Sequence, residues 1–77
     1  MKKPTVTFVL EIFMSKDYSF KTIFPASEYG GEEPAYLIAK SVGDEYNKSG
    51  HDFVIYKETV EAVSFVMTGG VKNEKYD

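Results

Sequence analysis

The side chain best suited to catalysis in this chain is His51, which is its only histidine. A lone imidazole can act as a general acid or base near neutral pH, and Asp52 and Ser49 lie close to it in the sequence. Adjacent residues on a strand point to opposite faces, however, so Asp52 is poorly placed to orient the imidazole ring. We therefore interpret His51 as a solvated loop histidine that follows the end of a helix, and we predict no catalytic residue.

Carboxylates stand in adjacent pairs at two places, Glu32-Glu33 and Asp44-Glu45. A hard cation needs several oxygen ligands that converge from one loop, whereas adjacent residues on a helix diverge. Glu58 and Glu61 could add oxygens across a turn, but the chain contains no Asp-x-Asp-x-Asp-Gly pattern. These acids fit a helix start and a solvated helix face, and we predict no metal site.

The paired glycines Gly30-Gly31 precede a predicted helix, which is where a phosphate-binding loop would lie. Such a loop needs more glycine and normally a lysine at the helix start. Glu32 and Glu33 stand there instead and would repel an anion. We interpret the glycines as a flexible entry to the helix and predict no cofactor.

The string Ser49-Gly-His-Asp-Phe53 places a histidine between a predicted helix and a predicted strand. It resembles the Gly-Ser-His-x-x-Phe signature of the HicA-type messenger-RNA interferase toxins over about five residues. Ser and Gly are exchanged relative to that signature, the chain is acidic instead of basic, and two strands follow without the terminal helix of that family. The resemblance implies RNA cleavage by His51, and a toxin-like or nucleic-acid-processing domain is the alternative that it adds.

Composition limits the classes of protein that this chain can belong to. Its 77 residues allow one domain, and a hydrophobic content of 43% with six Phe and six Tyr is ample for a core. The absence of Cys excludes disulfides and fits a cytoplasmic protein. We expect no export signal, and no apolar stretch approaches the roughly 20 residues that span a membrane.

The charge pattern argues against a nucleic-acid partner. Nine basic residues are outnumbered by twelve acidic ones, for a net charge of -3, and the basic residues are scattered singly. Nucleic-acid binding usually requires a clustered positive patch. Aromatic side chains such as Tyr18, Phe20 and Tyr56 could stack on bases. A non-catalytic nucleic-acid binder is therefore a further alternative, although aromatic residues at strand spacing fit a hydrophobic core better.

The strongest structural signal is the run Thr5–Met14, which is apolar at every even position. Side chains alternate along a strand, so this pattern predicts one continuous apolar face. Val9 and Phe13 make the opposite face partly apolar as well. Both faces need cover, which is typical of a central strand.

The next two segments predict a hairpin and then a helix. Tyr18–Phe24 resumes the alternation after a turn at Ser15–Asp17, and Pro25 ends it. The loop 26–31 then leads to a helix from about Pro34 to Lys48, which has carboxylates at its start and Gly50 past its end. We predict an ion pair between Asp44 and Lys48 on this helix. The side of the helix that we predict to be buried consists of Ala35, Ile38, Ala39, Val42 and Tyr46.

Two more strands are predicted, Phe53–Tyr56 and Val60–Met67, with a turn at Lys57–Thr59 and with Val63, Phe65 and Met67 on one face. A single long strand with a bulge is the alternative to the turn. We predict an α+β fold in the order β-β-α-β-β: an antiparallel four-stranded sheet with one helix packed on one face. Residues 1–70 form one domain, and residues 71–77 form a flexible tail.

One short helix cannot cover both faces of such a sheet, so apolar side chains are left over on the second face. The sequence therefore predicts a small non-enzymatic protein-interaction module, of the size and style of bacteriophage accessory proteins that bind and inhibit or modulate a host protein. The expected partner is a protein, either a second copy of the chain in a homo-oligomer or a different protein. The predicted partner-binding residues are Val9, Phe13 and Ile23 on the sheet, with Tyr36 and Leu37 on the helix.

Overall fold

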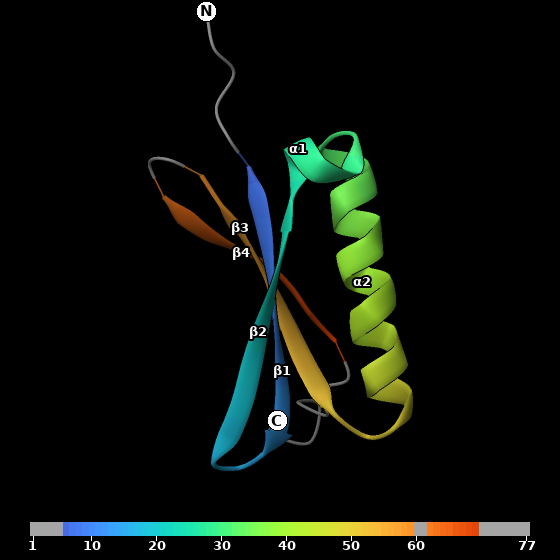
Figure 1. Ribbon diagram of the computed structural model, residues 1–77. Coiled ribbons are helices and arrows are strands. Elements are labelled where there is room, and N and C mark those ends of the chain that lie inside the picture. The colour runs from blue at the N-terminus through green and yellow to red at the C-terminus, as the bar shows by residue number, and fades with distance from the viewer. Residues whose placement is uncertain (1–5, 60–61, 70–77) are drawn as a thin grey trace, which may run out of the picture.

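The computed structural model describes residues 6–59 and 62–69 and shows a four-stranded sheet with one long helix against it (Figure 1). The strand order is β2-β1-β3-β4, and all three pairings are antiparallel. The predicted α+β fold, with the helix on one face of an antiparallel sheet, is confirmed. The elements are β1 (Thr7–Ser15), β2 (Tyr18–Pro25), α1 (Ala26–Tyr29), α2 (Glu32–Lys48), β3 (Asp52–Glu58) and β4 (Val63–Gly69).

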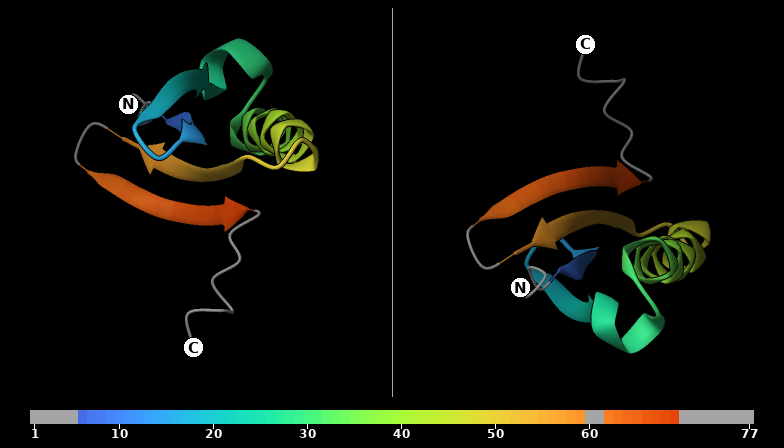
Figure 2. Two further views of the ribbon diagram at one scale, coloured as in Figure 1. Left: turned by 90° about the horizontal axis from the view of Figure 1, so that it is seen from below. Right: turned by 90° about the horizontal axis from the view of Figure 1, so that it is seen from above.

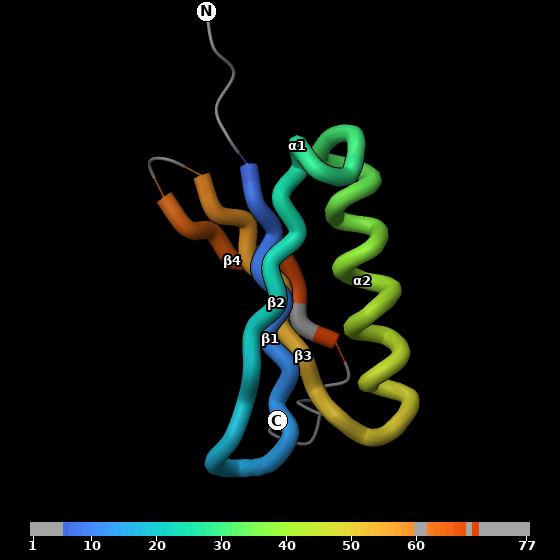
Figure 3. Tube along the Cα trace, in the orientation of Figure 1, coloured from blue at the N-terminus to red at the C-terminus, as the bar shows by residue number. Residues whose placement is uncertain are grey.

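β1 is a central strand, as its two apolar faces predict. It pairs with β2 through a tight turn at Lys16 and Asp17, and with β3 on its other side. The tube trace shows β2 and β3 flanking β1, with β4 beyond β3 (Figure 3). β2 and β4 are therefore the edge strands of the sheet.

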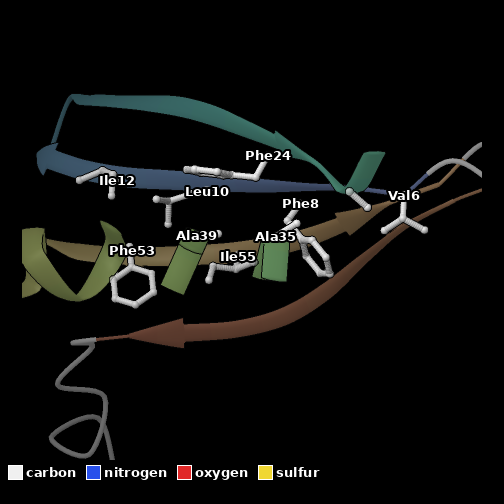
Figure 4. Close-up of a cluster of buried hydrophobic side chains, with 10 residues drawn as sticks. Val6, Phe8, Leu10, Ile12, Phe24, Ala35, Ala39, Phe53 and Ile55 are labelled. Atoms are coloured by element: carbon white, nitrogen blue, oxygen red, sulfur yellow. The ribbon is translucent and has the colours of Figure 1, made fainter. Parts of the chain in front are cut away.

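α2 covers the face formed by the even-numbered residues of β1 (Figure 2). The helix presents small residues to the sheet, because its buried positions are Ala35, Ala39 and Gly43. Small residues let the helix lie close to the strands, and the larger side chains of the core come from the sheet (Figure 4). That core contains Val6, Phe8, Leu10, Ile12, Phe24, Ala26, Ala35, Ala39, Phe53 and Ile55.

The ring of Phe53 fits tightly between two glycines. A Cβ atom at Gly43 would lie 2.7 Å from the ring, and one at Gly69 would lie 2.2 Å from it. Both separations are far below the normal contact distance of carbon atoms. Gly43 on α2 and Gly69 on β4 thus leave the space that the ring occupies.

The loop predicted at 26–31 contains one helical turn, α1. The Ala26 N–H donates a hydrogen bond to the Val6 carbonyl at 2.8 Å, and Tyr29 packs on Phe24 with ring centroids 5.8 Å apart. Gly30 then ends the turn with φ 88°, a backbone conformation that suits glycine. The glycines therefore end α1 and lead directly into α2, which begins at Glu32, two residues before the predicted start.

Two details of α2 differ from the prediction. Ile38 is exposed at the flank of the helix, whereas Gly43, which the apolar pattern passed over, is buried. Asp44 pairs with Lys40 at 3.0 Å instead of with Lys48, which contacts Glu45 at 3.3 Å. Each charge had two partners within one turn of helix, so sequence spacing alone did not select the pair.

β3 is longer than predicted, and β4 begins and ends later in the chain than predicted. β3 continues through Lys57 and Glu58, which were expected to turn. A bulge in β4 sets Tyr56 opposite Phe65 and Ile55 opposite Met67, so Met67 lies on the other face from Phe65. Residues 1–5, 60–61 and the predicted tail 71–77 lie outside the described part of the chain.

Candidate functional site

The face of the sheet opposite α2, called the open face here, carries the odd-numbered residues of β1. Residues that are directly opposite in an antiparallel pair share a face, so the register identifies their neighbours on β2, β3 and β4. No described helix packs on this face, which Figure 2 shows free beside the strands. Its apolar members are Val9 and Phe13 on β1, Ile23 on β2, Val54 and Tyr56 on β3, and Val63 and Phe65 on β4.

Four of these residues form a row that crosses all four strands. Val9 stands opposite Ile23 on one side and opposite Tyr56 on the other, and Tyr56 stands opposite Phe65. Ile23 and Phe65, at the two ends, are 59% and 61% exposed. The row Ile23–Val9–Tyr56–Phe65, called the apolar row here, is aliphatic on β2 and β1 and aromatic on β3 and β4.

Other apolar residues extend the row toward both ends of the strands. Phe13 is 41% exposed near the β1–β2 turn, and Val63 is 60% exposed at the start of β4. Val54 lies at the centre of the face and is only 5% exposed, although it is not part of the core cluster under α2. The centre of the open face therefore contains one buried side chain.

The charged groups that the described strands place on the open face are few. Glu11 stands directly opposite Lys21, and the Ser19 hydroxyl donates a hydrogen bond to Glu11 Oε2 at 2.7 Å. Asp52 and Glu58 lie at the two ends of β3. The open face is therefore mostly apolar, with the Glu11–Lys21 pair among the apolar residues and with Asp52 and Glu58 at its two ends.

The two predicted helix residues are separated from this face and from each other. Leu37 is 52% exposed on the outer side of α2. Tyr36 packs against the covered face: its ring lies 5.7 Å from that of Phe8, and its hydroxyl donates to Met67 Sδ at 3.3 Å. Val9, Phe13 and Ile23 thus belong to one surface, whereas Tyr36 and Leu37 do not join it.

His51 is half-buried in the connection between α2 and β3. Its ring lies 6.4 Å from that of Tyr46, its N–H donates to the Tyr46 carbonyl at 3.1 Å, and its carbonyl accepts from Asn47 Nδ2 at 3.3 Å. These contacts close the end of α2. Among the described residues, no hydrogen bond or ion pair joins the imidazole to a carboxylate or a hydroxyl, so the geometry there favours a structural role.

Three of the acidic residues weighed in the sequence, Glu32, Asp44 and Glu45, each contact a single lysine. Glu32 contacts Lys57 at 3.2 Å across to β3. Lys40 donates a hydrogen bond to Asp44, and this bond, together with the Asp44 charge, raises the pKa of the Lys40 ammonium above its ordinary value. Within residues 6–59 and 62–69, no three His, Asp or Glu side chains gather closely enough to hold a metal ion.

Four apolar residues of the open face were not among the predicted binding residues: Val54, Tyr56, Val63 and Phe65. Their apolar character was visible, but their place beside Val9 depends on the register between β1, β3 and β4. Register is a long-range property, and the bulge at Val66 shifts it by one residue. The alternation of Val63 and Phe65 was the available local signal.

A comparison of the chain with protein-family models, with curated proteins and with solved structures found no significant match in any of the three. Neither described helix has the length and apolar character needed to cross a membrane. The open face is therefore assigned from its own geometry.

Proposed function

We propose that this protein is a small non-enzymatic binding module that binds a protein partner through the open face of its sheet. The observation that carries the proposal is the apolar row, which crosses four strands and ends in two side chains that are each about 60% exposed. Contiguous apolar surface of this kind marks a site of interaction on a folded domain.

Inhibition or modulation of the bound protein is the activity that we propose for such a module. When a partner packs on the open face, the part of the partner's surface in contact is no longer accessible to other molecules. The acidic, cysteine-free composition that suggested a cytoplasmic accessory protein is compatible with this role. The arrangement around His51 does not support cleavage of RNA, and on the open face the described strands carry one lysine, Lys21, beside Glu11, which argues against a nucleic-acid ligand.

The test is a capture experiment in which tagged and untagged copies are present together with the proteins of the source cell. Three tagged forms are compared: the natural sequence, the open-face variant Ile23→Asp/Phe65→Asp, and the control Leu37→Asp on the outer side of α2. We expect the natural form and the control to retain the same protein and the open-face variant to lose it. Each protein retained is then purified and titrated against all three forms.

Equal retention by all three forms would contradict the proposal, because binding would then not depend on the open face. Retention of nothing, not even an untagged copy, would contradict it as well. Ile23 and Phe65 are mostly solvent-exposed, so their substitution should leave the fold intact. Far-UV circular dichroism of each variant checks this.

A further inference from the structure

We infer that the protein covering the open face is a second copy of this chain, so that two sheets pack face to face about a two-fold axis and form one β-sandwich. This inference rests on the proposed function, since it names the partner of the same surface. Three features of the face support it: the area available, the order of residues along the apolar row, and the placement of the charges.

The area of the open face lies near the lower limit for a specific dimer. Four strands about 4.8 Å apart and roughly seven residues long, at about 3.3 Å per residue, give a flat footprint of roughly 440 Å² per copy. Two copies together give a footprint of roughly 900 Å², and side-chain relief brings the buried area to about 1,000 Å², the lower end of the range for specific interfaces. A 77-residue chain also has the most to gain from a second layer, because small domains bury little of their surface.

The apolar row is complementary to itself. A two-fold axis that runs along the strands, between β1 and β3, places β1 over the partner's β3 and β2 over the partner's β4. Val9 then faces the partner's Tyr56, and Ile23 faces the partner's Phe65. The aliphatic half of each row therefore packs on the aromatic half of the other, and the same two contacts occur twice.

The charges on the open face do not oppose this arrangement. The same axis places each carboxylate of β1 and β3 over an uncharged residue of the partner. Asp52 lies over the partner's Phe13, Glu58 over the partner's Thr7, and Glu11 over the partner's Val54. No carboxylate is placed over another carboxylate. Within its own copy, Glu11 keeps the hydrogen bond from the Ser19 hydroxyl and has Lys21 as its cross-strand neighbour.

The first experiment measures mass by sedimentation equilibrium from 1 to 200 µM, a range chosen to bracket affinities around 10 µM. We expect the natural chain to reach twice its mass of 8.7 kDa. Ile23→Lys and Phe65→Glu, each alone, should raise the dissociation constant by at least about 100-fold, because each buries two unpaired charges per dimer. Leu37→Asp should leave it unchanged.

The second experiment tests the geometry. Mixing Ile23→Lys copies with Phe65→Glu copies should restore a dimer that contains one of each. In that mixed dimer, the Lys at 23 faces the Glu at 65, while the natural Phe65 and Ile23 still face each other on the other side. Pairing through the edge strand β2 or β4 would not produce this rescue, since residues 23 and 65 would not meet.

A monomeric natural chain at 200 µM would overturn the inference, as would a dimer that persists in both single variants. A dimer that both variants lose but that mixing fails to restore would overturn the two-fold arrangement. The proposed function fails separately: if the natural chain is monomeric but captures a different protein through Ile23 and Phe65, the binding module stands and the homodimer does not.

Discussion

The two faces of the sheet are built from similar residues and have opposite fates. On β1, Phe8, Leu10 and Ile12 are buried under α2, whereas Phe13 on the other side of the same strand is exposed. Both faces carry aromatic and β-branched side chains in alternation. The apolar content of a strand therefore does not decide which face is buried; the element available to cover it does.

The reason that only one face is covered is geometric. A helix is about 10 Å in diameter, while a four-stranded sheet is roughly 19 Å wide, so α2 cannot cover even one face completely. Met14 and Phe20 at the margin of the covered face remain half-buried. Neither described helix packs on the open face, and the apolar row is exposed as a consequence.

The covered face should show the largest response to truncation. Phe53 is buried between Gly43 and Gly69, and replacing it with alanine leaves a cavity that the close helix cannot fill. We expect Phe53→Ala to destabilise the fold by about 3–5 kcal/mol. Urea unfolding followed by circular dichroism measures this. A loss below about 1 kcal/mol would mean that the core under α2 is loose enough to collapse around the gap.

The close approach of α2 to the sheet can be tested at Gly43. Alanine there improves helix propensity by about 1 kcal/mol, but its Cβ would lie 2.7 Å from the Phe53 ring. Overpacking costs typically 1–3 kcal/mol, so we expect Gly43→Ala to be net destabilising. The matched control is Ser41→Ala on the exposed side of α2, which should stabilise by a few tenths of a kcal/mol. Equal stability of the two variants would contradict the tight contact.

The open face should respond in the opposite way. Ile23→Thr keeps a β-branched side chain at a position that is mostly solvent-exposed, so at low micromolar concentration we expect stability within about 0.5 kcal/mol of the natural chain. At high concentration the natural chain should melt at a higher temperature than when dilute, because association stabilises the folded state. Ile23→Thr should lose that concentration dependence, which calorimetry at two concentrations would show. Severe destabilisation of dilute Ile23→Thr would mean that the open face is core.

The sequence predicted the fold better than the details of its packing. Period-two alternation in β1 and the amphipathic pattern of α2 are local signals. Each predicts which residues lie on the same face of its own element. Val9, Phe13 and Ile23 were placed on one face for the same reason. The roles of Gly43, Tyr36 and Phe65 depend on distances between segments far apart in the chain, and the bulge at Val66 reversed the face of Met67. Local periodicity carries no information on such contacts.

The outer side of α2 gives a baseline for both sheet faces, and its response should be the smallest. Lys40 donates to Asp44 at 3.0 Å on an exposed surface, and this bond raises the pKa of Lys40. Because the pKa is higher in the folded state, the contribution to stability is fully present at neutral pH and is lost as pH rises through the folded-state value. Asp44→Asn should lower the Lys40 pKa toward its ordinary value, as an NMR titration of the lysine side chain would show. Stability should scarcely change, since exposed ion pairs contribute little. A loss comparable to that of Gly43→Ala would contradict the view that packing against the sheet, and not the solvated side of the helix, holds α2 in place.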